Sequence, residues 1–381
     1  MDILFVTLSP IDATFSMSFR NRAILNGFVK LGHKVDVLTI CPYDDSIRVR
    51  NLDLSQYGTI IRLNKSSNSS KKIGTPNKGS NSLLSRLIRM VYHRVMPFDS
   101  SFFLIRSLSV DLLPKKKYDT IISSSDPKTS HLAVKQLIKT GLVYKTWIQY
   151  WGDPLTNDIT TKLIYPKVVL KLLEKRLMKG ADKIIYVSPI TCQEQSRLFK
   201  VYSSKMRFLP IPYEKDKIYP PTQNSKFNVG YFGFYLKSVR NIVPLYNAVK
   251  DISHNIHLTI GGSTDLKLDE CENISIYPNL NDVFRYESLS DLIVVVLNLR
   301  GGQIPGKLYH LAATNKPILV ILDGDFKEVI KEYLQGFQRF IMCENDEVSI
   351  SQAIIKQYLS KQEFVPSPLL TSSSIASQFL H

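Results

Sequence analysis

The segment LIVVVLNLRGGQIPGKLYHLAATNKPILVILDGD, residues 292–325, decides the fold. It opens on an apolar run (292–297), passes through a loop with three glycines into a stretch of helical periodicity, and ends on a second apolar run (317–322). Two such strands joined by a crossover helix form one unit of a parallel sheet that is buried on both faces. The segment therefore predicts an α/β protein.

The loop in this segment has the composition of an anion pocket. Gly301, Gly302 and Gly306 allow a ligand to approach the backbone closely, and Pro305 suits the first turn of a helix. Lys307 adds a cation beside the amides at the start of that helix. The spacing is neither that of a P-loop nor that of a dinucleotide-binding motif. On local grounds alone, a flexible connection between a strand and a helix is an equal alternative.

A second anion signal lies in VGYFGFYLKSVRNIVPLYNAV (229–249). We expect a strand that ends at Gly233 and a helix that begins near Val239, with Lys237 and Arg240 beside the helix start. Amides, an ammonium and a guanidinium would together hold a diphosphate. The recurrence of this pattern at two strand-to-helix junctions of one domain favours a functional interpretation.

The alternation of apolar runs with helical segments continues along nearly the whole chain, which predicts two doubly wound halves. Prolines and charges interrupt it at 208–226, so we predict an N-terminal domain at 1–213 and a C-terminal domain at 214–360, with 361–381 packing back on the first. We expect the halves to face each other across a cleft at the carboxyl ends of their strands. The polar run 65–82 is expected to be a surface insertion.

The element boundaries follow from periodicity and from Gly and Pro positions, with Gly32 expected at a helix C-terminus. The expected strands are 3–8, 35–40, 118–123, 145–150 and 183–187 in the first half, and 227–233, 257–260, 273–276, 292–297, 317–322 and 339–342 in the second. The helices with the clearest periodicity are 20–31, 239–250, 306–314, 325–335 and 348–359.

The net charge of +16 is distributed unevenly. Residues 1–213 hold 33 Lys and Arg against 15 Asp and Glu, whereas residues 214–381 hold 16 against 18. This favours an anionic partner for the first half, such as a membrane surface or a phospholipid-linked substrate, and the alternative is a lysine-rich composition without a partner. The four cysteines show no disulfide or zinc spacing, and no apolar stretch is long enough to span a membrane, so we expect a cytoplasmic protein.

Six ordered segments carry a resemblance to a known family. They are ILFVTL (3–8) with LGHKVDVLTI (31–40), WIQYWGDPL (147–155), EKRLMKGADKIIYVSP (174–189), FLPIPYEKD (208–216), VGYFGFYLKSVRNI (229–242) and IPGKLYHLAATNKPIL (304–319). Together they resemble the retaining glycosyltransferases of family 4 and their relatives, which have the GT-B fold of two Rossmann-like domains. The resemblance implies that the C-terminal domain binds a nucleotide sugar, that the N-terminal domain receives the acceptor, and that no metal or other cofactor is needed.

The resemblance also implies the donor-binding residues. They are Gly233, Lys237, Arg240, Gly302, Gly306, Lys307, Leu308 and His310. Arg240 would stabilise the departing diphosphate, which makes it a candidate catalytic residue. The chain departs from the family at two positions, since His310 stands where a glutamate usually holds the ribose hydroxyls and Gly302 where another glutamate lies near the donor sugar. DGD (323–325) resembles a metal motif, but we expect Asp325 to cap a helix.

Four residues of the first domain are candidates for the acceptor side. Ser16 and Arg20 follow the first strand in a loop that lacks the family's paired glycines, and N-capping is the alternative for them. Asp153 and His131 follow other expected strands and are candidate catalytic groups near the reacting centre. A cap or turn role is the alternative for both.

The segment SLLSRLIRMVYHRVMPF (82–98) has the pattern of a basic amphipathic helix. Its apolar side chains share one helical face, while Arg86, Arg89 and Arg94 lie largely elsewhere. Such a helix can lie on an anionic membrane surface. The alternative is a helix packed on its own domain.

We therefore expect a GT-B glycosyltransferase that moves a sugar from a nucleotide-sugar donor to a lipid-linked or oligosaccharide acceptor. Bacterial surface-polysaccharide biosynthesis, as for O-antigen or capsule, is the expected setting, with retention of configuration and a location in the cytoplasm or on the inner face of the membrane. The alternatives are a sugar-nucleotide 2-epimerase on the same fold, a homologue that binds without catalysis, and a nucleic-acid-binding protein. No motif supports the last, and no nucleic-acid partner is expected.

Overall fold

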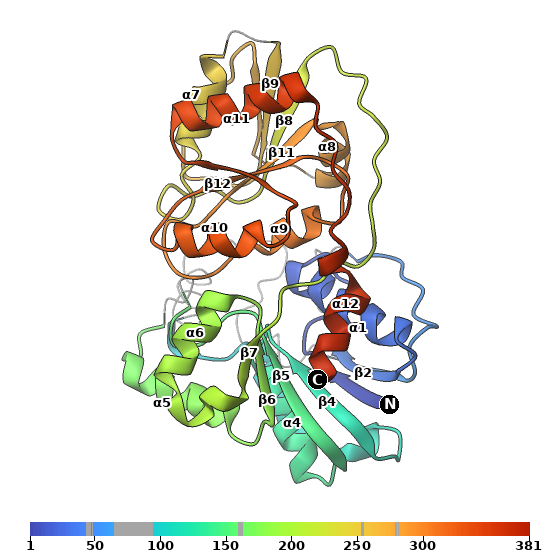
Figure 1. The fold of residues 1–381 in the computed structure, drawn as a ribbon. Coiled ribbons are helices and arrows are strands. Elements are labelled where there is room, and N and C mark those ends of the chain that lie inside the picture. The colour runs from blue at the N-terminus through green and yellow to red at the C-terminus, as the bar shows by residue number, and fades with distance from the viewer. Residues whose placement is uncertain are drawn as a thin grey trace, which may run out of the picture. The chain divides into compact units, whose positions relative to one another are not determined.

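The chain is seen here in a computed structural model, which describes residues 1–42, 47, 49–64, 94–158, 163–252, 255–278, 280 and 282–381. It forms two compact units (Figure 1). Unit 1 comprises Met1–Pro210 and Ser372–His381, and unit 2 comprises Ile211–Thr371. The boundary thus falls three residues before the expected one, and of the segment 361–381 that was expected to pack on the first domain only 372–381 belong to unit 1. The expected insertion 65–82 and residues 82–93 of the expected amphipathic helix lie outside the described residues.

Unit 1 is built on a seven-stranded parallel sheet with the order β3-β2-β1-β4-β5-β6-β7. Its strands are β1 (Asp2–Val6), β2 (Lys34–Ile40), β3 (Ile60–Leu63), β4 (Tyr118–Ser124), β5 (Tyr144–Trp151), β6 (Lys183–Tyr186) and β7 (Met206–Phe208). Its α-helices are α1 (Ser16–Lys30), α4 (Thr129–Lys139), α5 (Lys167–Met178), α6 (Pro189–Leu198) and α12 (Ser372–Leu380). Short 3-10 helices lie at Ser100–Ser107, Val110–Leu112 and Lys200–Lys205.

Unit 2 repeats this topology with six parallel strands in the order β10-β9-β8-β11-β12-β13. The strands are β8 (Phe227–Phe232), β9 (Ile256–Gly261), β10 (Ile274–Tyr277), β11 (Leu292–Val296), β12 (Ile318–Leu322) and β13 (Ile341–Glu344). The helices are α7 (Val243–Lys250), α8 (Val283–Leu289), α9 (Gly306–Leu311), α10 (Lys327–Gln335) and α11 (Glu347–Ser360), with a 3-10 turn at Pro368–Leu370. The predicted α/β class with two doubly wound sheets is confirmed.

Helices cover both faces of the first sheet, which explains why its strands read as continuous apolar runs. Leu4 and Val6 of β1 pack into a core that includes residues of α4, whereas Ile3 and Phe5 pack into a second core with α1 and α12. Neighbouring residues of a strand point to opposite faces, so both sets must be apolar. All four side chains are buried.

The C-terminal helix α12 belongs to unit 1, where it packs along α1 (Figure 1). The contact is so close at Gly27 that a Cβ there would clash with the carbonyl oxygen of Ser372. Phe379 is fully buried and meets Tyr150 of β5 edge-on, with 4.9 Å between the ring centroids. The end of the chain thus completes the core of the first unit.

Several helix boundaries differ from those expected. α1 begins at Ser16 rather than residue 20, α7 begins at Val243 rather than near Val239, and α9 ends at Leu311. The expected cap at Asp325 was wrong, because α10 begins at Lys327 after Phe326. Gly32 was predicted correctly, since it follows α1 with a φ of 78°. Among the described residues, no helix combines the length and apolar character needed to span a bilayer.

Candidate functional site

Each sheet has a switch point between its two central strands, where the chain turns toward opposite edges. It lies between β1 and β4 in unit 1 and between β8 and β11 in unit 2. Ligands of doubly wound sheets bind at the carboxyl ends of the strands beside this point. The cleft between the two domains stays a prediction.

In unit 2 the loops that follow β8 and β9 meet through their backbones. Gly233 directly follows β8 with a φ of 155°, and its amide donates a hydrogen bond of 2.7 Å to the carbonyl of Gly261. A Cβ at Gly262 would clash with the carbonyl oxygen of Gly233. Because these positions are glycines, the backbones of the two loops can approach each other closely at this edge of the sheet.

Arg240 lies in the segment between β8 and α7 and is half-buried. Its Nε donates to Oδ1 of Asn298 at 2.8 Å, and its Nη1 donates to the carbonyl of Phe234 at 3.3 Å. The Asn298 amide in turn donates to the carbonyl of Gln303 at 3.0 Å. Asn298, which sequence reasoning missed, thus ties the guanidinium to the glycine loop. Lys237 is exposed nearby, and its backbone amide donates to Asp265.

Lys307 is oriented toward the end of β8. Its ammonium donates to the carbonyl of Phe232 at 2.5 Å and lies 3.3 Å from Oε1 of Glu287, a buried carboxylate on α8. Burial lowers the pKa of Lys307, Glu287 opposes this shift, and the nearby cations Lys217 and Arg240 add to it. Lys307 therefore lies near two further cations at this switch point, while its own charge is paired with Glu287.

The pairing of Lys307 with Glu287 gives a stability prediction. Lys307→Met should lower the free energy of unfolding by roughly 1–3 kcal/mol, because it leaves a buried carboxylate without its cation. Adding Glu287→Gln to that variant should restore most of the loss. Urea unfolding of the wild type, both single variants and the double variant measures the coupling. If Glu287→Gln deepens the loss in the Lys307→Met background, the pairing is wrong.

The other predicted donor residues lie along the loop and α9. Gly302 is buried, Gly306 begins α9, and His310 is half-buried in its last turn. Leu308 is fully buried, so its predicted contact with a ligand finds no support in the structure. Among the residues that the structure describes, no three His, Cys, Asp or Glu side chains form a group that could hold a metal ion.

In unit 1 the switch point holds a cluster of charged side chains. Arg20 of α1 is 5% exposed, its guanidinium lies 4.9 Å from the ring centroid of Tyr150, and its Nη2 donates to Ser124 at 3.4 Å. A Cβ at Gly152 would lie 2.7 Å from Oδ2 of Asp126 and closer still to Nη1 of Arg20. Arg20 and Asp126 therefore flank the backbone of Gly152.

Asp126 follows β4 and is another group that sequence reasoning missed. Its Oδ1 accepts from the ammonium of Lys128 at 3.0 Å. Although burial opposes it, Lys128, Arg20 and the backbone amide of Asp153 together lower the pKa of Asp126. The Asp126 side chain retains 26% exposure. It is thus a carboxylate at neutral pH that solvent can reach.

The predicted acceptor-side residues are only partly brought together. Asp153 lies beside Asp126 and Lys128, and its negative charge raises the pKa of Lys128. Ser16 is the exposed first residue of α1. The alternative of N-capping was wrong for this helix, since Phe15 occupies the cap position and no side chain caps it.

His131 lies in the core of unit 1 rather than at its surface. It is 0% exposed, and its ring packs on Trp151 with 4.4 Å between centroids. Ser123 Oγ accepts from the indole N–H of Trp147 and lies 2.8 Å from Nδ1 of His131, to which it can therefore donate. Burial lowers the pKa of His131 to about 3, so the imidazole is neutral. These contacts describe a core histidine, and the sequence-based catalytic role finds no support in them.

The buried His131 should make unit 1 sensitive to mild acid. The unfolded chain takes up a proton near pH 6.5, whereas the folded chain does so only near 3, so stability is lost as the pH falls through this window. The free energy of unfolding should fall by up to about 1.4 kcal/mol per pH unit from this residue. Urea unfolding at pH 7 and pH 5 should show a smaller decrease for His131→Asn, and the wild-type decrease for the exposed His381→Asn. Equal decreases in all three proteins would contradict the assignment.

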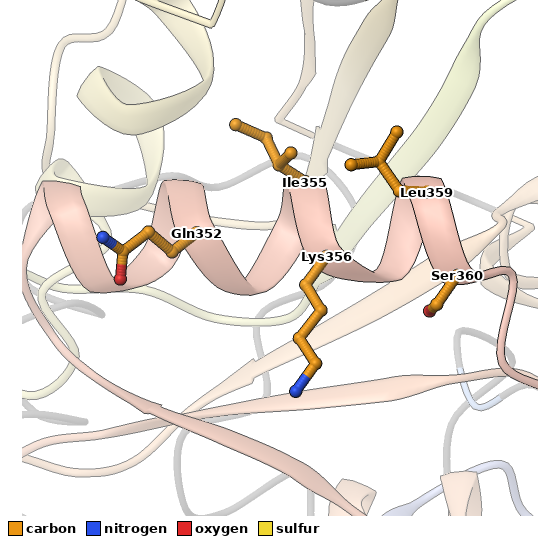
Figure 2. Close-up of a pocket in the computed structure, with 5 residues that line it drawn as sticks. All are labelled: Gln352, Ile355, Lys356, Leu359 and Ser360. Carbon is orange, nitrogen blue, oxygen red and sulfur yellow. The ribbon is translucent and has the colours of Figure 1, made fainter.

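The outer face of α11 carries a shallow hollow of about 560 Å³ that is not a candidate for the site (Figure 2). Ile355 and Leu359 point to one side of the helix, while Lys356 points away from them. Gln352 and Ser360 complete the lining of the hollow, which contains none of the polar groups described above.

Comparison with solved structures finds proteins that share this architecture. Sucrose-phosphate synthase from Thermosynechococcus elongatus matches at a TM-score of 0.54 and 14% identity, over 100% of this chain and 94% of that one. Anabaena HepE, in complex with UDP and glucose, matches at 0.55 and 12%, over 99% and 95%. The catalytic domain of starch synthase IV from Arabidopsis thaliana, bound to ADP and acarbose, matches at 0.60 and 10%, over 100% and 97%.

The fold is GT-B. The GT-B match extends over the whole chain, so both units take part in it. No protein-family model matches the chain, and no curated protein matches it in sequence. At these identities the likeness concerns the fold, and the chemistry has to be argued from the residues at the two switch points.

Proposed function

We propose that the chain is a glycosyltransferase that moves a sugar from a nucleotide-sugar donor to a saccharide acceptor. The observation that carries the proposal is the group of three neighbouring cations, Arg240, Lys307 and Lys217, of which Lys307 is paired with Glu287, at the switch point of the second GT-B sheet. This is a surplus of fixed positive charge where such sheets bind ligands. The structures of HepE with UDP and of starch synthase IV with ADP support a nucleoside diphosphate as the group it holds.

In the proposed reaction the bond between the sugar carbon and the diphosphate oxygen breaks, and the acceptor oxygen bonds to that carbon. The acceptor hydroxyl releases its proton to the departing phosphate. Negative charge develops on the diphosphate as it leaves, and Arg240, already oriented by Asn298, stabilises that charge without reorganisation. Fixed cations of the chain thus supply the main catalytic effect in this proposal.

The acceptor is proposed to bind at the switch point of unit 1. Asp126 is a partly exposed carboxylate held by Lys128, with Arg20 and Asp153 beside it. Because its pKa is lowered, it is a weak base, and its proposed role is to accept a hydrogen bond from an acceptor hydroxyl and orient it. Arg20 and Lys128 hold this carboxylate in place.

The family resemblance supports two finer proposals, namely retention of configuration and a role in bacterial surface-polysaccharide biosynthesis. The charge of residues 1–213 supports a lipid-linked acceptor at the inner face of the cytoplasmic membrane. The likeness of fold is compatible with other sugar acceptors. These proposals are therefore tested apart from sugar transfer itself.

Membrane attachment is tested with liposomes. The wild type should sediment with vesicles that contain anionic lipid and not with neutral vesicles, since the attraction is largely electrostatic. Replacing Arg86, Arg89 and Arg94 with glutamine should weaken the free energy of membrane binding by roughly 1 kcal/mol per residue. Unchanged sedimentation of this variant would reject the segment 82–98 as the membrane contact.

Sugar transfer is tested by incubating the full chain with a panel of UDP, ADP, GDP and TDP sugars. Release of the nucleoside diphosphate, measured by mass spectrometry, should occur slowly with water as acceptor for one donor of the panel and faster with a saccharide acceptor. Binding without release would instead favour a non-catalytic homologue. Conversion of the donor into its 2-epimer would favour the epimerase.

A further inference from the structure

Unit 2 contains a cavity of about 510 Å³ at the edge of its sheet opposite the donor site. Its walls come from the segment before β8, the amino ends of β8, β11 and β12, and the chain around the end of α11. The volume lies within the range of small-molecule sites. Because the proposed diphosphate site lies at the carboxyl ends of β8 and β11, the cavity belongs to a different part of the unit.

A buried lysine lines this cavity. Lys316 is only 6% exposed, and among the described residues no hydrogen bond or ion pair holds its ammonium. Its nearest aromatic partner is the ring of Tyr219, whose centroid lies 5.8 Å from Nζ. Its Nζ is not among the fully solvent-excluded polar atoms, so an anion in the cavity would give this ammonium the hydrogen-bond acceptor that it lacks. Burial lowers the pKa of Lys316, although the charge of Asp291 opposes this.

The carboxylates of the cavity do not fill this role. Asp291 accepts hydrogen bonds from the hydroxyl of Thr222, from the side-chain amide of Asn224 at 3.3 Å and from the backbone amide of Asn228 at 2.8 Å. These three hydrogen bonds orient the carboxylate, and among the described residues no ion pair joins it to Lys316. Glu363 also lines the cavity, but its side chain is exposed to water.

Two further lysines and several aromatic rings complete the lining. Lys226 and Lys361 add positive charge, and no ion pair holds either ammonium within the described part of the chain. Phe227 and Tyr358 meet edge-on with 5.5 Å between centroids, and Phe364 also lines the cavity. Aromatic faces pack against the apolar face of a sugar ring, while ammonium groups bind carboxylates and phosphates.

We propose that this cavity is a second binding site, for a monosaccharide that carries a carboxylate or a phosphate. The anion would lie at Lys316, and the ring would pack on the aromatic side chains. The site does not depend on the proposed sugar transfer, because none of its residues belongs to the diphosphate site.

The test is isothermal calorimetry of the full chain with glucuronate, glucose 1-phosphate, glucose and inorganic phosphate as probes. At least one acidic sugar should bind more tightly than glucose and phosphate, and comparison of the first two tells which anion the site takes. Lys316→Met keeps the apolar stem and should weaken binding by roughly tenfold or more. Lys250→Met, at an exposed position outside the cavity, and Arg240→Ala should leave it unchanged.

Three results would overturn the proposal. The first two are no binding of either acidic sugar, and binding by Lys316→Met that equals that of the wild type. The third is loss of binding in Arg240→Ala, which would show that the ligand binds at the proposed donor site instead. If Lys316→Met does not fold, the double variant Lys226→Met, Lys361→Met takes its place, because both side chains reach solvent. It should weaken binding as well, and unchanged binding in this variant would count against the site.

Discussion

Replacing Arg240 with alanine should lower kcat/KM for sugar transfer by roughly 100-fold or more, the loss typical of removing a group that stabilises developing charge. The guanidinium is held by Asn298 and Phe234 in the structure, so the wild type needs no rearrangement to meet the leaving diphosphate. Most of the effect should fall on kcat, because the charge is greater in the transition state than in the bound donor. Steady-state kinetics with the donor found in the panel measures it.

Two further variants sharpen this prediction. Arg240→Lys keeps the charge but loses the planar fork that Asn298 orients, so its kcat/KM should lie between those of the wild type and the alanine variant. Arg285→Ala removes an exposed arginine of α8 and is the matched control. Wild-type kinetics in Arg240→Ala, or equal losses in Arg240→Ala and Arg285→Ala, would refute the role of Arg240.

Replacing Asp126 with asparagine should lower kcat/KM for the acceptor by roughly 10- to 100-fold, corresponding to about 1.5–3 kcal/mol for a hydrogen bond to a charged group. Asparagine preserves the shape of the side chain but removes the charge that Lys128 and Arg20 surround. Binding of the donor should not change, since the donor is proposed to bind in unit 2. Kinetics with varied acceptor, combined with donor calorimetry, separates the two effects.

The control for this variant is Asp119→Asn. Asp119 lies near the amino end of the same strand, β4, whereas Asp126 follows its carboxyl end. The Asp119 carboxylate pairs with the ammonium of Lys145. Its loss should leave the acceptor kinetics at the wild-type level. A result in which Asp126→Asn impairs donor binding as strongly as transfer would contradict the proposed division of roles.

The sequence determined the architecture well because each central strand is buried on both faces. Apolar runs as short as 292–297 and 317–322 are typical of strands that are buried on both faces. Their alternation with helical segments indicates a parallel sheet. The strands that escaped notice, Ile60–Leu63 and Met206–Phe208, lie at the two edges of the first sheet. They are short and only partly buried, so their composition carries a weak signal.

Helix starts were harder, and the reason is visible at α7. The apolar periodicity extends back to Val239, but the helix begins at Val243, with Pro244 in its first turn. The proline is the better signal, since its missing N–H costs nothing there. At α1 no side chain caps the first turn, so the sequence carried no signal for a start at Ser16.

The site was only half visible in the sequence. Arg240 and Lys307 stand in recognisable loops, whereas Glu287 comes from a short helix that becomes relevant only once the fold brings it to Lys307. Asp126 lies two residues beyond the end of a buried strand, and this position was a usable signal. His131 shows the opposite difficulty, because a histidine after a strand looks the same in sequence whether it faces a ligand or the core, and in the structure it is buried.

The central claim is that the carboxyl edge of the second GT-B sheet holds a nucleoside diphosphate. The most direct measurement is calorimetry of UDP, ADP, GDP and TDP, with the matching monophosphates, against the wild type and Arg240→Ala. At least one diphosphate should bind the wild type more tightly than its monophosphate does, and Arg240→Ala should weaken it roughly tenfold or more. Absence of binding by every diphosphate, or equal binding by the two proteins, would contradict the account.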